Sequence, residues 1–358
     1  MAFTDIDNPE LNFQTKTFSG NAGTNAITLD GSENMQPDWV WLKKRNGTAN
    51  HHLVNSVAGA GRYLYANLSN AEGGDGADGG GNDLLASFNS DGFTLDAGAD
   101  SNASGATGVA WCWKAGGSAS SNSDGSISSS VSVNTTAGFS IVSYTGGGGV
   151  ATIGHGLGVV PAMIIVKPRD TADNWRVYHK GVDTSEPYDY HLRLNDNAAR
   201  DDDAGFWNDT APTSSVFTIG TNQGVSKSSD NFISYCFAEK QGYSKFKSYT
   251  GNGNSDGPFV FLGFKPAWIM IKRTDDSANW CMYDNKRSSF NVSDDALVAD
   301  DNVSEYTNNS GMAMDFTAQG FKVRGTNSFF NTSGSTYIFM AFAEQPFVNS
   351  SGVPTNAR

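Results

Sequence analysis

Histidine is the side chain that most often binds metals or transfers protons near neutral pH. The chain of 358 residues has five, and none has a metal-ligand spacing such as HExxH. They are His51, His52, His155, His179 and His191. The sequence GHGLG around His155 could be an active-site loop, but we interpret it as a tight turn before a strand. With no GxSxG elbow, Walker loop or CxxC pair, we assign no catalytic, cofactor-binding or metal-binding residue and expect no enzyme.

Acidic residues cluster at two places that could offer oxygen ligands to calcium, NDNAARDDD at residues 195–203 and ADDN at residues 299–302. Neither has the EF-hand pattern, so calcium binding stays an open alternative. NSDG, at residues 89–92 and 122–125, is part of the sialidase Asp-box pattern without its downstream Trp, and we interpret both as turns. The spacing of paired carboxylates for glycoside hydrolysis is set by the fold, so a polysaccharide depolymerase also stays open.

The composition favours short strands joined by polar loops. Hydrophobic residues make up 38%, and 41 glycines accompany many Asn, Ser, Thr and Asp residues. Apolar and aromatic runs lie between these turn formers, without a strong 3.6-residue period, so we expect little helix. The net charge of −13 argues against nucleic acid as a partner. No apolar run is long enough to insert into a membrane, and the first residues do not resemble a secretory signal.

Three segments of the chain repeat one pattern at constant spacing. PDWVWLKKR, PAMIIVKPR and PAWIMIKRT begin at Pro37, Pro161 and Pro266, so successive copies are 124 and 105 residues apart. A closing strand ends on an aromatic residue 76 positions after each proline, at Trp113, Phe237 and Phe342. A phenylalanine in a short strand lies between them, at Phe93, Phe217 and Phe321. Such regular spacing predicts three copies of one structural repeat.

Other residues recur at the same spacing. Lysines align at Lys43, Lys167 and Lys272, and asparagines at Asn50, Asn174 and Asn279. The residue after each asparagine is His51, Trp175 or Trp280. The tryptophans could form a platform for sugar rings, but they alternate with Val177 and Met282, so we expect them to pack in a core.

The two offsets differ by 19 residues, about the length of the Gly- and Ser-rich segment between the first and second copies. We interpret it as a flexible linker that leaves the first domain mobile, whereas copies two and three follow each other closely. The predicted organisation is repeat one at residues 1–115, the linker at 116–136, repeat two at 137–240, repeat three at 241–348 and a C-terminal tail at 349–358.

Each copy reads as an antiparallel β-sandwich. In the closing strands large residues alternate with small ones, as Trp111 and Trp113 do with Ala110 and Cys112. We expect the large side to pack against a facing sheet. The fold class is therefore all-β, with three tandem antiparallel β-sandwich repeats of jelly-roll or lectin-like type. A propeller is the alternative, and only three copies argue against it.

The three cysteines are Cys112, Cys236 and Cys281, and the first two occupy the same repeat position. If each copy has its own core, they cannot reach each other, so we predict no disulfide.

Two segments carry a resemblance to a known group of proteins. TIGHGLGVVPAMIIVKPRDTADNWRVYHKG at residues 152–181 and FAEKQGYSKFKSYTGNG at residues 237–253 resemble a repeat of virion-associated proteins from marine tailed phages, including cyanophages. Those proteins are described as tail-fibre or tail-associated, so the resemblance implies a location in the virion. This chain lacks an evident coiled-coil or shaft region, which keeps a capsid decoration or a short appendage open.

The function that fits best is a structural and adhesive virion protein of a tailed bacteriophage, in a tail fibre or short appendage for host attachment. The features shared by the copies are apolar strand positions and not a polar trio, which favours this function over a depolymerase. The missing export signal argues against a cellular lectin. The expected partners are other virion proteins, host cell-surface glycan and further copies of the chain in a homotrimer. The protein would be made in the host cytoplasm and released by lysis.

Overall fold

The structure is a computed structural model that describes residues 4–74 and 84–354. Residues 1–3 and 75–83 of the first predicted repeat, and 355–358 of the predicted tail, lie outside the described residues. Strands hold 41% of the chain and helices 6%, which confirms the all-β prediction. Among the described residues no helix is long and apolar enough to cross a membrane. The helical turns are η1 (Pro9–Leu11), η2 (Asp100–Asn102), α1 (Ala204–Trp207), α2 (Gln223–Ser226), η3 (Ser310–Met312) and α3 (Ser328–Asn331).

The first unit, residues 4–115, has a large and a small antiparallel sheet. The order of the large sheet is β1 (Phe13–Ser19), β9 (Thr107–Trp113), β3 (Trp39–Lys44), β4 (His52–Asn55), β5 (Arg62–Tyr65) and β6 (Gly73–Gly74). The order of the small sheet is β2 (Asn25–Thr28), β8 (Gly92–Leu95) and β7 (Leu85–Asn89).

The second unit, residues 116–240, has the same two layers. The large sheet has the order β10 (Ser120–Asn122), β11 (Ser129–Asn134), β12 (Phe139–Thr145), β19 (Asn231–Phe237), β14 (Met163–Pro168), β15 (Arg176–His179), β16 (Tyr190–Arg193) and β17 (Asp201–Asp202). The small sheet pairs β13 (Ala151–Gly154) with β18 (Val216–Ile219).

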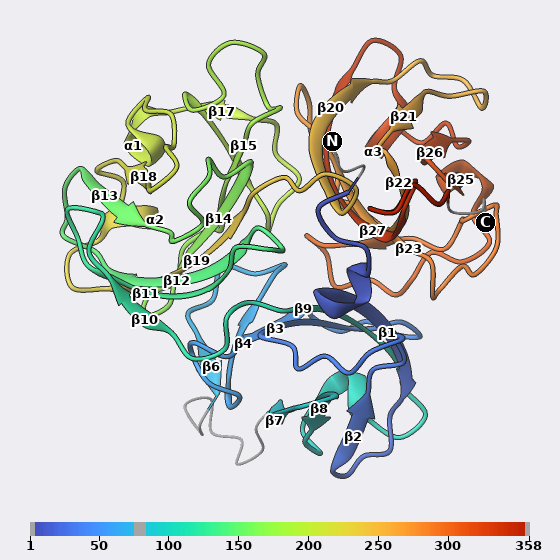
Figure 1. Ribbon diagram of the computed structural model, residues 1–358, viewed down its shortest axis with the longest axis horizontal. Helices are drawn as coiled ribbons and strands as arrows, with labels where there is room; N and C mark the ends of the chain where they lie inside the picture. Colours follow the sequence, from blue (N-terminus) through green and yellow to red (C-terminus); the bar gives the residue numbers. More distant parts are fainter. Residues whose placement is uncertain (1–3, 75–83, 355–358) are drawn as a thin grey trace.

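The third unit, residues 241–354, follows the same plan. Its large sheet has the order β20 (Ser244–Thr250), β27 (Thr336–Pro346), β22 (Phe264–Arg273), β23 (Cys281–Asp284) and β24 (Leu297–Val298). Its small sheet has the order β21 (Phe259–Phe261), β26 (Gly320–Val323) and β25 (Met314–Thr317). Figure 1 shows the three units around a common centre.

Strand registers repeat with the sequence offsets. The strand after each proline pairs with the closing strand through Trp39 and Trp113, Met163 and Phe237, and Trp268 and Phe342. In each small sheet, the central phenylalanine pairs with an apolar residue of an edge strand: Ile27 with Phe93, Ile153 with Phe217 and Val260 with Phe321. The named residues, which are evenly spaced in the sequence, therefore make equivalent strand pairings.

Each unit has a core of its own between its two sheets. These three cores contain Cys112, Cys236 and Cys281 respectively, and all three thiols are buried and free. The predicted absence of a disulfide is confirmed in the structure. The cysteines lie in separate two-layer cores, which keeps their thiols apart.

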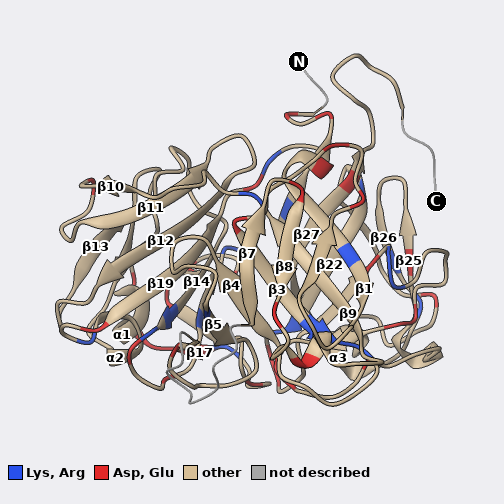
Figure 2. Cartoon of the chain, turned by 90° about the horizontal axis from the view of Figure 1, so that it is seen from below, with Lys and Arg blue, Asp and Glu red and all other residues tan. Residues whose placement is uncertain are grey.

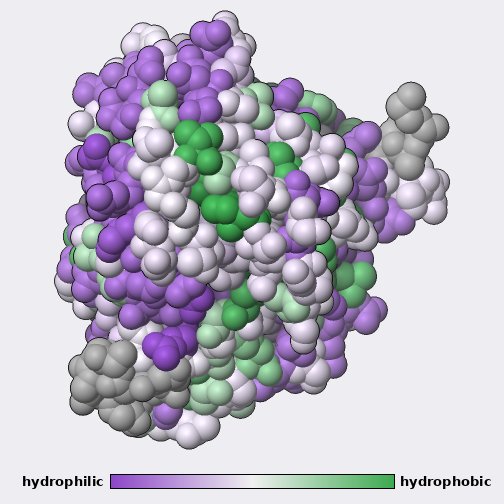
Figure 3. Space-filling view, turned by 90° about the vertical axis from the view of Figure 1, so that its left-hand side faces the viewer, coloured by the Kyte–Doolittle hydropathy of each residue, from purple (hydrophilic) through white to green (hydrophobic). Residues whose placement is uncertain are grey.

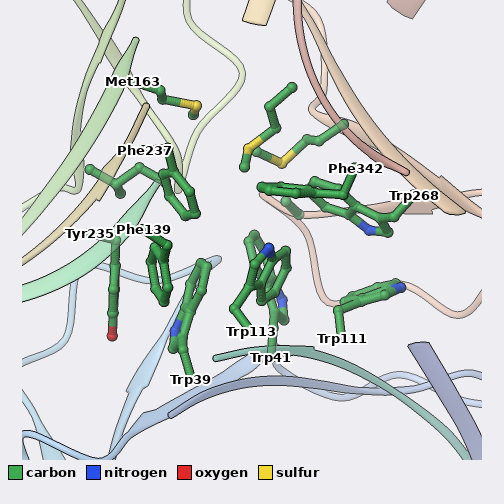
Figure 4. Packing of buried hydrophobic residues seen from close by; sticks show 14 of the residues in the cluster. Trp39, Trp41, Trp111, Trp113, Phe139, Met163, Tyr235, Phe237, Trp268 and Phe342 are labelled. Atoms are coloured by element: carbon green, nitrogen blue, oxygen red, sulfur yellow. The ribbon is translucent and has the colours of Figure 1, made fainter. Parts of the chain in front are cut away.

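A fourth core, the central cluster, lies where the three large sheets meet (Figure 4). The indole of Trp39 stacks on Tyr235 with ring centroids 4.3 Å apart, and Phe13 stacks on Phe342 at 5.2 Å. These pairs join the first unit to the second and the third. The expectation of a mobile first domain is wrong, because movement of that unit would expose these rings to water.

The expected orientation of the closing strands is also wrong. Their large side chains, such as Trp113 and Phe237, enter the central cluster, and their small ones, such as Cys112 and Cys236, face the small sheet. Small residues let the two layers of one unit approach closely, and the large aromatics fill the wider space between units.

The segment predicted as a flexible linker, residues 116–136, contributes two strands, β10 and β11, to a sheet. Ser120 pairs with Val131, and β11 pairs with β12 from Ser129 to Asn134. The prediction failed because a serine-rich composition hides the alternation of Ser130 and Ser132 with Val131 and Val133. Val131 is buried beneath the sheet, so the segment belongs to the second unit.

Candidate functional site

The aligned lysines join the units into a ring. Each lysine is buried and its Nζ donates a hydrogen bond to a backbone carbonyl of another unit. Lys43 donates to Asn302 at 3.3 Å, Lys167 to Ser69 at 3.1 Å and Lys272 to Asn197 at 3.0 Å. The first unit thus contacts the third, the third contacts the second and the second contacts the first. Burial lowers the pKa of all three ammonium groups to about 8.

Backbone hydrogen bonds follow the same ring. The amides of Glu72, Arg200 and Glu305 donate to the carbonyls of Arg169, Thr274 and Arg45 at 2.8, 2.9 and 2.9 Å. Two of these contacts also carry ion pairs across the junctions, between Arg169 and Glu72 at 2.7 Å and between Arg45 and Glu305 at 2.8 Å. Each junction therefore uses the same repeat positions, and the ring closes within one chain.

The residues considered as a sugar platform belong to these junctions. Trp175 and Trp280 are buried, and their indole N–H groups donate to the carbonyls of Tyr65 and Arg193 in neighbouring units, both at 2.8 Å. His51 is also buried and accepts a hydrogen bond at Nδ1 from the Trp41 indole. The prediction of core packing is confirmed, and these rings cannot stack on a ligand.

The five histidines lie in the interior of the protein. All five are buried, and burial lowers the pKa of each. His155 receives a hydrogen bond from the Leu157 amide and contacts the Thr213 carbonyl, which fixes the turn before the strand β14. The interpretation of GHGLG as a structural turn is confirmed.

The acidic segments are also occupied by structural contacts. Asp203 caps α1, and Asp201 and Asp202 form β17. Asp300 accepts a hydrogen bond from the Trp280 amide, and burial raises the pKa of its carboxyl to about 7. Within residues 4–74 and 84–354, no three His, Cys, Asp or Glu side chains are placed to share a metal ion.

An opening in the described surface, which we call the open junction, lies where the second and third units meet. It is a cavity of about 630 Å³ lined from the second unit by Lys180 and Glu239 and from the third unit by Lys245, Phe261 and Gly263. The chain passes from one unit to the next along its wall, and the N-terminal segment reaches it at Asp5. At the junction of the third and first units, the described residues enclose only about 20 Å³.

Charges within the open junction are balanced. The Glu239 carboxylate lies 2.7 Å from the Lys180 ammonium and 3.2 Å from that of Lys245. Burial opposes ionisation of Glu239, but the two ammonium groups outweigh burial and lower its pKa. The corresponding carboxylate at the next junction, Glu344, lies 2.7 Å from the Lys265 ammonium and accepts a hydrogen bond from the Asn285 amide at 2.7 Å. The open junction therefore offers polar groups and the aromatic ring of Phe261, and its charged side chains carry no strong net charge.

A second depression lies on the outside of the third unit and holds about 610 Å³. Its lining includes Val292, Ser310 and Thr326, with Arg324 2.6 Å from the Asp315 carboxylate. Phe290, two residues before Val292, is 80% exposed. The depression thus offers hydroxyl groups and an ion pair, and an exposed aromatic ring lies two residues from its lining in the chain.

Sequence reasoning missed Phe259, Phe261 and Phe290, the exposed aromatic residues of the third unit. Phe259 and Phe261 take the places of Thr152 and Gly154 in the second unit. A comparison of the second and third copies, position by position, would have found this pair, because two phenylalanines replace Thr152 and Gly154 on an edge strand.

Charged residues elsewhere do not segregate by sign. Figure 2 shows acidic and basic residues interspersed along loops and strand ends. The face in Figure 3, on the side of the second unit, is mostly polar with small apolar patches.

A search of curated proteins finds no match. A family model described as a domain of unknown function, DUF7483, matches residues 8–346. The match includes all three large sheets and both walls of the open junction. The chain therefore belongs to the DUF7483 family of domains of unknown function.

Proposed function

We propose that this protein is a structural and adhesive component of a tailed-phage particle, in a tail fibre or short appendage. The observation that carries the proposal is the closed ring of three units. A virion component must hold a fixed shape and present surfaces in a fixed geometry, and the central cluster with its equivalent junctions supports that role. The resemblance to virion-associated repeats of marine phages supports the location.

The three units are, in this proposal, copies of one jelly-roll-like repeat. The matching registers through Trp113, Phe237 and Phe342, together with the equivalent lysine contacts, support a common origin. In symmetric oligomers, head-to-tail contacts between identical copies produce a ring when the rotation from one copy to the next closes. The three units follow the same geometry. Here the ring is built from one chain, so the copies are free to differ in their loops.

Host-surface glycan is the ligand class that we propose for adhesion. Sugars present hydroxyl groups and apolar C–H faces, which polar side chains and exposed aromatic rings recognise. The outer depression offers polar groups at Arg324, Asp315 and Thr326. Phe290, two residues before Val292 in its lining, offers an exposed aromatic ring. A weak site of this kind gains avidity when a particle carries many copies.

The test has two parts. Fractionated virions should contain the chain in the tail fraction, and the purified protein should bind host-surface polysaccharide. Arg324→Ala should weaken binding at least tenfold, whereas the control Lys227→Ala in the second unit, whose side chain is 35% exposed against 43% for Arg324, should not. Absence from virions would remove the location, and presence only in heads would favour a capsid decoration. Release of reducing sugar ends would favour a depolymerase.

Assembly as a homotrimer is a further part of the proposal, since fibres and appendages are built on closed symmetry. Light scattering should then give three times the 38.0-kDa mass of the chain. A monomer mass at micromolar concentration would contradict this part alone.

A further inference from the structure

The second unit contains an extended segment that covers two strand edges. β11 pairs with the outer edge of β12 in the large sheet. The residues before it run beside β13 in the small sheet, where Ile127 bridges Ile153 in parallel and the Ile127 amide donates to the Thr152 carbonyl at 3.2 Å. The Ser129 hydroxyl donates to the Gly154 carbonyl at 2.8 Å. This covering segment, residues 122–134, therefore protects both edges.

The third unit has the same two strands without a covering segment. β20 corresponds to β12, since Ser244 pairs with Phe342 as Phe139 pairs with Phe237. β21 corresponds to β13, since Val260 pairs with Phe321 as Ile153 pairs with Phe217. Both β20 and β21 are terminal strands of their sheets. The extra 19 residues before the second unit have no counterpart before the third.

Exposure changes as expected for edges that have lost their cover. Val142 of β12 is fully buried, whereas the equivalent Lys247 of β20 is exposed. On the small sheet, Phe259 and Phe261 are 49% and 58% exposed. The backbone edge of the first half of β20 already has one partner, because the Phe246 amide donates a long hydrogen bond of 3.4 Å to the Glu239 carboxylate.

The backbone of β21 is oriented to accept a further strand. The Val323 amide donates to the Pro258 carbonyl and the Leu262 amide donates to the Gln319 carbonyl. In an antiparallel pair, successive residues direct their N–H and C=O groups alternately toward and away from the partner strand. The groups of Phe259 and Phe261 therefore point away from β26, toward the open side.

The cavity at the open junction corresponds to space that the covering segment fills in the second unit. Side-chain carbons of Val131 and Val133 lie 3.2 and 3.5 Å from where a Cβ of Gly156 would be. Gly263, three residues after Val260 as Gly156 is after Ile153, lines the cavity together with Phe261. Both glycines have positive φ, at 71° and 82°, so the turn is shared. The cavity could thus hold apolar side chains of a polypeptide.

We propose that the β21 edge and the adjoining cavity of the third unit bind an extended segment of a partner polypeptide, which adds a strand as the covering segment does in the second unit. The segment carries little charge, with small polar residues alternating with β-branched ones, because the cavity is balanced in charge and its internal counterpart has Ser126, Ile127, Val131 and Val133. Backbone hydrogen bonds would supply affinity, and the cavity would select the side chains. This inference goes beyond the proposed function and does not rest on it.

The probe is a fluorescent peptide with the sequence of residues 122–134, NSDGSISSSVSVN. It should bind the intact protein in an anisotropy titration. Phe261→Lys should weaken binding at least tenfold, since an edge lysine opposes strand addition. Phe290→Lys is the matched control on the opposite edge of the same small sheet, where Asn291 bonds to Phe316 of β25, and it should leave binding unchanged. Both side chains are largely exposed, so thermal melts should confirm that the variants fold.

Hydrogen exchange gives a readout specific to strand addition. Bound peptide should slow exchange of the Phe259 and Phe261 amides at least tenfold. Binding without this protection, or no peptide binding at all, would overturn the proposal. Polysaccharide binding that Phe261→Lys abolishes, or a dimer that this variant dissociates, would overturn it in favour of a glycan or of a second copy. The peptide assay needs no virion, so its failure is distinguishable from failure of the proposed function.

Discussion

Replacing Phe342 with alanine should weaken the whole ring and not only the third unit. The side chain is 1% exposed, and its ring lies 5.2 Å from Phe13, 5.6 Å from Trp113 and 6.0 Å from Phe237. Truncation of a buried phenylalanine costs about 3–5 kcal/mol. Because the lost contacts belong to all three units, we expect the free energy of opening to fall by about that amount in each of them.

The three free cysteines allow each unit to be followed separately, since one thiol lies in each two-layer core. Native-state thiol labelling read by mass spectrometry follows the population of open forms. With a tenfold change for every 1.4 kcal/mol, labelling of Cys112, Cys236 and Cys281 should each accelerate by about a hundredfold or more.

Phe321→Ala is the matched control, because Phe321 is equally buried but lies in the core between the two sheets of the third unit. It should accelerate labelling of Cys281 more than that of Cys112. If Phe342→Ala accelerated Cys281 alone, the central cluster would not hold the units together, and the argument from the ring would be refuted.

Three further predictions concern a buried carboxyl group, the segment before the second unit and the thiols. Asp300→Asn should stabilise the protein by about 2–4 kcal/mol at pH 8 and by less at pH 5, measured by guanidinium denaturation. Burial raises the pKa of Asp300 from 3.8 to about 7, so the stability that its protonated carboxyl contributes is complete below pH 4 and is lost as the pH rises through 7. Asn195 accepts the equivalent hydrogen bond in the second unit, which shows that an amide fits this place. An equal gain in stability at both pH values would contradict the prediction. Limited proteolysis should leave β10 and β11 uncut in the folded protein, and early cleavage between Ser120 and Asn134 would restore the linker interpretation. Thiol titration after denaturation without reductant should count three thiols, and a count of one would reveal a disulfide.

The sequence by itself determined the all-β class and the matching strand pairs that recur along the chain. Alternation along a strand and a constant spacing are local properties, so Pro37, Pro161 and Pro266 were enough to locate three matching strands. The buried free cysteines and the structural turn at His155 followed from the same local patterns.

Tertiary structure decided which surfaces the large side chains face. Trp113 and Phe237 had to be buried, but burial against a facing sheet and burial against another unit produce the same alternation in sequence. The segment 116–136 was misread because its partners, β12 and β13, supply hydrogen bonds and apolar cover that its composition does not reveal. The open junction depends on a missing segment in the third unit, and an edge strand differs from a covered one only through what lies beside it in space.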